Sequence, residues 1–167
     1  IRVAVLDTGI SKHPDLDWTE DLVFNCSMDA NYIDEASGHG THVAGIIGAK
    51  NNDYGVVGVA PDCILIPIKV LNNNGGGSYE SIVAGIEKAI ELKADIISMS
   101  LGSSSAPPGK IHEVIKKAVA AGIIILAAAG NDGGVTNFPA RYDEVIAVAA
   151  IDENGDYATF TSGDDTV

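Results

Sequence analysis

The chain has 167 residues, 46% of them hydrophobic, which is enough for one domain with a buried core. It carries 23 Asp and Glu against 10 Lys and Arg, a formal net charge of −13. This balance argues against a nucleic-acid partner, which needs a basic surface. The longest apolar stretch, around 118–129, is interrupted by Gly122 and is too short to span a membrane.

Apolar runs alternate with amphipathic segments along the chain. Strands are expected at Arg2–Leu6, Cys63–Leu71, Asp95–Ser100, Ile123–Ala128 and Val145–Ala149, and helices at Gly40–Ala49, Ser78–Leu92 and Ile111–Ala121. Ser78 is the expected N-cap of the second helix, and Gly122 is expected to end the third. Near-continuous Ile and Val runs separated by helices indicate a parallel sheet. The predicted fold class is therefore α/β, with three layers: a mainly parallel β-sheet and helices on both of its faces.

Polar segments follow several of the predicted strands. Asp7 ends the first, Ser100-Leu101-Gly102 ends a later one, and Gly130-Asn131 follows another. In parallel sheets, function gathers beyond the carboxyl ends of the strands, so we expect these segments to converge on one edge.

The segment SGHGTHVAG, residues 37–45, is the most informative of the chain. It places His39 between two glycines at the start of a predicted helix, 32 residues after Asp7. The acid and the base could form a charge-stabilised imidazole, and the side-chain amide of Asn131 could serve as an oxyanion donor. Taken singly, each of these residues has a structural alternative. Asp7 could cap a turn, His39 could be a structural histidine, and Asn131 could be a cap or turn residue.

A metal site is a further alternative. His39 and His42 are three residues apart and could share a helix face, but the H-E-x-x-H pattern of zinc peptidases is missing. The spacing of Cys26 and Cys63 matches no metal motif, and both are expected to be unpaired.

Taken jointly, the three segments resemble the Asp, His and Asn blocks of the subtilisin-like serine proteases, or subtilases, in which the acid precedes the histidine by about 32 residues. The resemblance runs from Ile1 to about Ser162. It implies that residues 1–167 are a partial catalytic domain, with a subtilisin-like fold incomplete at both ends. The nucleophilic serine is expected beyond residue 167, near position ~196.

The resemblance also implies a role for each residue. Asp7 would orient His39, His39 would move the proton of the serine, and Asn131 would donate to the oxyanion. The glycines on either side of His39 are expected to keep backbone bulk away from the substrate.

Two segments resemble the edges that hold an extended peptide in the family, namely Gly75-Gly76-Gly77 and Ser100-Leu101-Gly102. By the same resemblance, Ala128 and Gly130, with their alanine neighbours, line the wall of the first specificity pocket. With Asp132 at its rim, this pocket is expected to accept basic or large apolar residues before the scissile bond.

A structural Ca²⁺ site is implied as well. The segment 50–56 resembles the calcium loop of the family, and the expected ligands are the Asp15 carboxylate, the Asn52 amide oxygen and the carbonyls of Lys50, Tyr54 and Val56. In the family, a residue from a segment ahead of Ile1 completes the site. The alternative reading of 50–56 is a polar turn.

Three functions follow as hypotheses. The first is a serine endopeptidase that acts on extended peptides or proteins, and that an inhibitory pro-segment could regulate. The second is an inactive peptide-binding module of the same fold, and the third is the metal-dependent hydrolase. Secretion is the default expectation in the family, although intracellular subtilases exist, and no nucleic-acid or membrane partner is expected.

Overall fold

A computed structural model describes residues 1–32 and 37–163. Within them, six parallel strands form one sheet in the order β2-β3-β1-β4-β5-β6. The strands are β1 (Arg2–Asp7), β2 (Phe24–Asn25), β3 (Ile64–Lys69), β4 (Ile96–Met99), β5 (Ile124–Ala128) and β6 (Ile146–Val148). Because they all run in one direction, their carboxyl ends meet at the same edge of the sheet.

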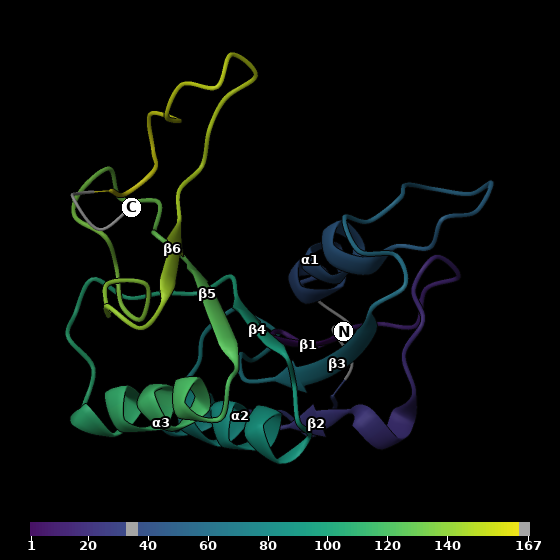
Figure 1. Cartoon of the computed structure of the whole chain (residues 1–167), viewed down its shortest axis with the longest axis horizontal. Helices are drawn as coiled ribbons and strands as arrows, with labels where there is room; N and C mark the ends of the chain where they lie inside the picture. Colours follow the sequence, from purple (N-terminus) through teal and green to yellow (C-terminus); the bar gives the residue numbers. More distant parts are fainter. Residues whose placement is uncertain (33–36, 164–167) are drawn as a thin grey trace.

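Helices cover both faces of this sheet (Figure 1). In the described residues these are α1 (His39–Gly48), α2 (Tyr79–Glu91) and α3 (Gly109–Ala120), with one short 3₁₀ helix, η1 (Glu20–Leu22). α2 and α3 pack side by side on one face, and α1 lies on the other. The prediction of a three-layer α/β fold is therefore confirmed.

The side chains of β1 alternate between the two cores. Ala4 and Leu6 belong to the large apolar cluster under α2 and α3, whereas Val3 and Val5 belong to the smaller cluster under α1. A slip of one residue would move each pair into the wrong core, so burial on both faces fixes the register of the strand. Asp7 follows Val5 by two residues and therefore faces the α1 side.

The predicted elements agree with the observed ones to within two residues at each end, but η1 and β2 were not predicted. Ser78 caps α2 as expected. Its hydroxyl accepts a hydrogen bond from the Ser81 amide at 3.1 Å, and the Ser81 hydroxyl accepts one from the Ser78 amide at 3.2 Å. This reciprocal pair is a capping box. Gly122 follows α3 with a φ of +85°, as expected for a helix stop.

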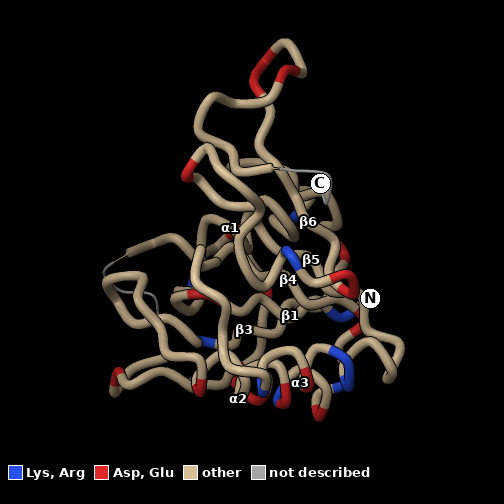
Figure 2. The backbone as a smooth tube through the Cα atoms, turned by 90° about the vertical axis from the view of Figure 1, so that its left-hand side faces the viewer, with Lys and Arg blue, Asp and Glu red and all other residues tan. Residues whose placement is uncertain are grey.

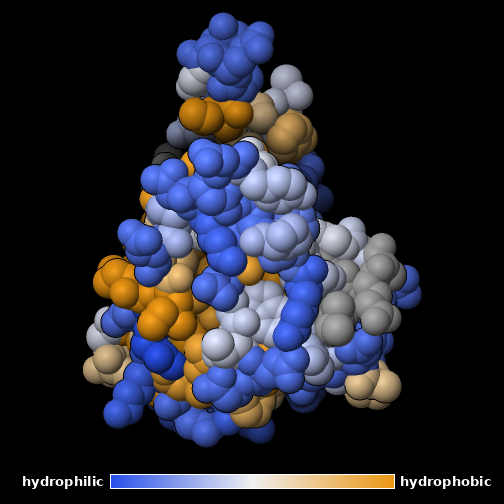
Figure 3. Space-filling view, turned by 90° about the vertical axis from the view of Figure 1, so that its right-hand side faces the viewer, coloured by the Kyte–Doolittle hydropathy of each residue, from blue (hydrophilic) through white to orange (hydrophobic). Residues whose placement is uncertain are grey.

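Acidic residues are spread along much of the backbone, and several of the fewer basic residues lie on α2 and α3 (Figure 2). Figure 3 shows one face on which apolar patches lie between hydrophilic ones. Exposed apolar side chains include Val56 and Val59 in the segment after α1, and Ile146 and Val148 on β6. No helix in the described residues is both long and apolar enough to cross a bilayer.

Close packing of α1 on the sheet depends on a glycine. A Cβ atom at Gly40 would overlap the carbonyl oxygen of Gly9 and would lie 3.1 Å from Asp7 Cβ. The expectation that this glycine leaves room for the substrate is therefore wrong, because Gly40 faces the end of β1. By contrast, a Cβ at Gly45, in the middle of the same helix, would meet nothing within 4 Å.

We predict opposite effects for alanine at these two glycines. Gly40→Ala should lower the free energy of unfolding by about 1–3 kcal/mol, because α1 must move away from β1. Gly45→Ala should raise it by about 0.4–1 kcal/mol, because alanine restricts the unfolded chain and favours the helix. Urea unfolding followed by circular dichroism measures both, and equal shifts in the two variants would contradict the packing described.

Candidate active site

The acidic residue of the site is fully buried at the carboxyl end of β1. Asp7 is 0% exposed, and its Oδ1 atom accepts hydrogen bonds from the Thr8 amide at 2.7 Å and from His39 Nδ1 at 2.7 Å. Its Oδ2 atom is buried without a hydrogen-bond partner in the described part of the chain. The backbone carbonyl of Asp7 accepts from the amides of Val70 and Leu71, which anchors it to the end of β3.

The basic residue opens α1 and is half exposed. His39 follows Gly38, which has a φ of +71°, and the side chain of His39 is 49% exposed. The next amide, that of Gly40, donates to Thr8 Oγ1 at 3.0 Å, so the start of the helix is tied to the residue after Asp7. With Nδ1 held by the carboxylate, Nε2 is the ring nitrogen left to accept a proton.

The amide residue lies beyond β5. Asn131 is exposed and follows Gly130, which has a φ of +120°. The Gly130 carbonyl accepts a hydrogen bond from the Ser162 amide at 2.9 Å, and a Cβ at Gly130 would crowd Asn137 and Ser162. The turn that carries Asn131 is thus held by residues more distant in the chain.

Asn137 also braces this turn from within. Its side-chain amide donates to Asp132 Oδ2 at 2.8 Å, and the Asp132 amide donates to Ser162 Oγ at 3.2 Å. The Asp132 carboxylate, expected at the rim of a pocket, is therefore engaged within its own loop. The sequence reading did not single out Asn137 or Ser162, both of which are buried polar residues.

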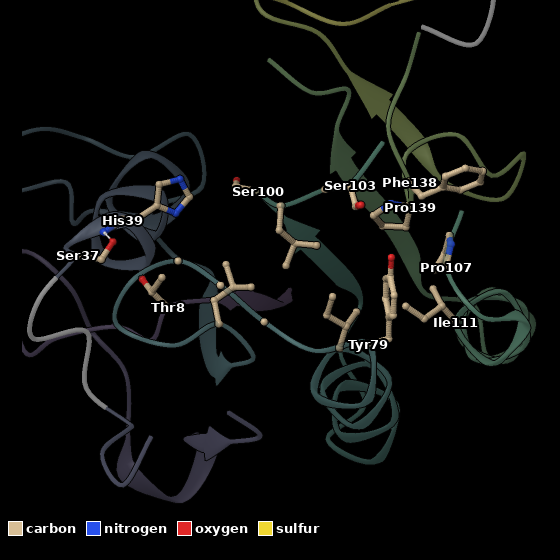
Figure 4. Close-up of a pocket in the computed structure, with 17 residues that line it drawn as sticks. Thr8, Ser37, His39, Tyr79, Ser100, Ser103, Pro107, Ile111, Phe138 and Pro139 are labelled. Atoms are coloured by element: carbon tan, nitrogen blue, oxygen red, sulfur yellow. Dashed lines mark hydrogen bonds between the residues drawn. The ribbon is translucent and has the colours of Figure 1, made fainter. Parts of the chain in front are cut away.

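A hollow of about 580 Å³ opens beside His39. It brings together both predicted peptide-binding segments, Gly75–Gly77 and Ser100–Gly102. Figure 4 shows Thr8, Ser37 and His39 on one side of the hollow, and Tyr79, Ile111 and Phe138 on the other. The full lining is Thr8, Ser37, His39, Leu71, Gly75, Gly76, Gly77, Tyr79, Ile82, Ser100, Leu101, Gly102, Ser103, Pro107, Ile111, Phe138 and Pro139.

Two of the predicted substrate-binding residues do not line this hollow. Ala128 lies behind Gly102, with its carbonyl oxygen 3.9 Å from a Cβ built on that glycine, and Gly130 packs against Asn137 and Ser162. The sequence reading missed the apolar wall supplied by Tyr79, Ile82 and Ile111. Their position in the sequence could have indicated this wall, because they lie in the first turns of α2 and α3. The N-terminal ends of these helices lie near the carboxyl edge of the sheet.

Of the residues predicted to bind Ca²⁺, Asn52 and Val56 contact the buried carboxylate of a third, Asp15. Asp15 is 3% exposed; it accepts hydrogen bonds from the Asn52 side chain at 3.0 Å and the Val56 amide at 3.2 Å. The Tyr54 amide donates to Asn52 Oδ1, and the Lys50 amide donates to the Asp15 carbonyl. None of the ion pairs among the described residues includes Asp15, so its charge is not balanced by a basic side chain.

The ligand set required by the metal-hydrolase alternative does not form in the described residues. No three His, Cys, Asp or Glu side chains there are grouped so that they could hold a metal ion, and His39 is already paired with Asp7. Cys26 and Cys63 are both free, and burial raises the pKa of each thiol.

Comparison with known proteins gives one family. The family model described as the subtilase family matches residues 1–167. A thermostable alkaline protease of Halalkalibacterium halodurans is 51% identical over 163 residues, which cover 96% of this chain and 44% of that protein. Subtilisin DY of Bacillus licheniformis is 44% identical over 168 residues (97% and 60%), and an intracellular serine protease of Paenibacillus polymyxa is 44% identical over 182 (100% and 54%). The chain thus spans about half the length of these relatives, and it belongs to the subtilase family.

Proposed function

We propose that this chain forms the acid, base and oxyanion parts of a serine endopeptidase, as a partial catalytic domain over residues 1–167. The observation that carries the proposal is the 2.7 Å hydrogen bond between buried Asp7 and half-exposed His39, beside a hollow flanked by two glycine-containing segments. The serine nucleophile of the Asp-His-Ser triad is proposed to come from sequence that follows residue 167.

In this mechanism the carboxylate of Asp7 keeps His39 in the tautomer with a proton on Nδ1 and stabilises the imidazolium that forms. His39 Nε2 takes the proton of the serine hydroxyl and returns it to the leaving amine. The side chain of Asn131 donates to the developing oxyanion. The equivalent contact contributes about 3–4 kcal/mol in subtilisin.

The substrate is proposed to be an extended peptide that lies between Gly75–Gly77 and Ser100–Gly102 and hydrogen-bonds to both backbones. An apolar side chain of the substrate would fill the hollow lined by Tyr79, Ile82 and Ile111. The residue before the scissile bond is proposed to carry a basic or large apolar side chain.

The names of the relatives are consistent with more than one cellular location. They include a minor extracellular protease of Bacillus subtilis and the intracellular protease of P. polymyxa. We propose secretion and control by an inhibitory pro-segment, with an intracellular setting as the alternative.

The proposed function is tested with the polypeptide that carries this sequence together with the segment proposed to follow it. An organophosphonate serine probe should label it, and it should hydrolyse peptides. His39→Ala should lower kcat by about 10⁶-fold and Asp7→Asn by about 10⁴-fold, as for the corresponding losses in subtilisin. Steady-state kinetics on a chromogenic peptide measures both.

His42→Ala is the matched control, because His42 is exposed and lies one turn further along the same helix. Its activity should stay within a few-fold of the unmodified protein. If His42→Ala is as damaging as His39→Ala, the assignment of the base to His39 is contradicted. Binding of peptides without labelling or hydrolysis would favour the inactive peptide-binding module.

We also propose a structural Ca²⁺ site at Asp15. The buried, unbalanced carboxylate of Asp15, together with the Asn52 amide oxygen and the carbonyls of Lys50, Tyr54 and Val56, would supply the hard oxygen ligands that Ca²⁺ prefers. A bound cation would supply the positive charge that the described ion pairs do not provide.

Calcium should therefore stabilise this chain. At a concentration 100 times Kd, a single site adds about 2.7 kcal/mol to the free energy of unfolding. Thermal unfolding with Ca²⁺ or with a chelator should show a higher Tm with Ca²⁺, and Asp15→Asn should abolish this difference. Asp17→Asn, at an exposed position two residues away, should retain it. An equal response of the two variants would argue against the site.

A further inference from the structure

A lysine is buried at the active edge of the sheet. Lys69, the last residue of β3, is 0% exposed and lies opposite Asp7 in the pairing of β1 with β3. Burying an ammonium group costs several kcal/mol unless it is paired and hydrogen-bonded. A buried lysine beside the catalytic acid therefore needs an explanation that the mechanism above does not give.

Three oxygen atoms surround the ammonium group. Lys69 Nζ donates to the Thr8 carbonyl at 2.6 Å and to Asn73 Oδ1 at 2.9 Å, and it lies 3.4 Å from Asp29 Oδ2. An ammonium has three N–H groups and no acceptor. Two of the three contacts are hydrogen bonds, and the third is an ion pair with Asp29. The charge is balanced by Asp29, whose side chain is 26% exposed.

One branch of this network leads to the acid and the base. Thr8 directly follows Asp7, and its amide donates to Asp7 Oδ1. Its hydroxyl accepts the amide of Gly40, the residue after His39. Lys69 thus binds the carbonyl of Thr8, the residue that links the end of β1 at Asp7 to the start of α1 at His39.

The other branch leads to one of the two proposed peptide-binding segments. The Asn73 amide donates to Asp29 Oδ2 at 2.8 Å, so Asn73 is held by both members of the ion pair. The neighbouring Asn72 closes the loop, because its Oδ1 accepts the amides of Asn74 and Gly76. This loop leads into Gly75–Gly77, which line the hollow beside His39.

We infer that Lys69 is a positioning residue that holds the catalytic Asp7–Thr8 segment and the peptide-binding segment Gly75–Gly77 in fixed relation. Moving either branch would leave a buried ammonium partly unpaired, and the low dielectric of the interior makes that displacement costly. The inference rests on the proposed function, since it gives Lys69 a role in how a bound peptide meets the acid–base pair.

A purely structural lysine would affect stability and nothing else. A positioning lysine would in addition change the kinetics of molecules that are correctly folded. The two roles separate when rates are expressed per active site, counted by titration with the organophosphonate probe.

The experiment compares Lys69→Met and Asn73→Ala in the polypeptide used above, with two substrates. One is a long peptide that reaches Gly75–Gly77, and the other is a small ester that does not. Lys69→Met should lower kcat per titrated site by about 10- to 100-fold on both substrates, the size of effect produced by small misplacements of catalytic groups, and should raise KM for the peptide. Asn73→Ala frees only the second branch, so KM for the peptide should rise with a smaller change in kcat for the ester.

Lys88→Met is the matched control. Lys88 lies on α2 away from the hollow, pairs with Glu91 at 2.8 Å and stacks on Phe24, and its side chain is 16% exposed. Replacing it should change stability and leave kcat and KM unchanged for both substrates. If Lys69→Met behaves in the same way, with a lower Tm and unchanged kinetics per titrated site, the inference is overturned. If Lys69→Met does not fold, Asn73→Ala decides: a raised KM for the peptide supports the inference, and an unchanged KM overturns it.

Failure of the proposed function would look different. An unmodified protein that the probe does not label and that turns over neither substrate contradicts the proposed function, together with the inference that rests on it. A labelled protein whose Lys69 variant has normal kinetics contradicts the inference alone.

Discussion

The hydrogen bond between Asp7 and His39 constrains how β1 and α1 pack against each other. It joins residues 32 positions apart, at 2.7 Å, and one of the two is fully buried. The end of β1 and the start of α1 must therefore touch, which requires a glycine at position 40. The Thr8 hydroxyl then ties the same two backbones together, so the contact between acid and base depends on the packing of a helix on a strand.

Much of the architecture could be predicted because apolar runs and amphipathic helices alternate strongly along the chain. The two elements missed have no such pattern. β2 has two residues and exists through its pairing with β3, and η1 is a single turn without a buried residue. Short elements of this kind are formed by tertiary contacts, which a local pattern does not contain.

The site was predictable where it lies on strand ends and less so where it depends on packing between distant segments. Asp7 and Ser100–Gly102 follow from the parallel sheet, whereas Gly130 turns toward Asn137 and Ser162, which no local pattern connects to it. The apolar wall of the hollow depends on how the first turns of α2 and α3 meet the sheet edge. In the sequence, Lys69 is a single polar residue within the predicted strand Cys63–Leu71, and only its tertiary surroundings reveal a buried charge.

The alternation of the strands explains why the two buried charges occur side by side. Val3 and Val5 face the α1 core, as Leu65 does on β3, and residues two or four positions further on share that face. Asp7 and Lys69 therefore both project to the side of α1, beyond the last apolar layer. On the other face, Leu6 and Ile68 continue the large core under α2 and α3. The same apolar residues that hold the strands in register thus place an acid and an ammonium where the start of α1 and the loop proposed to bind peptides can reach them. The rigidity of the core is therefore transmitted to the site.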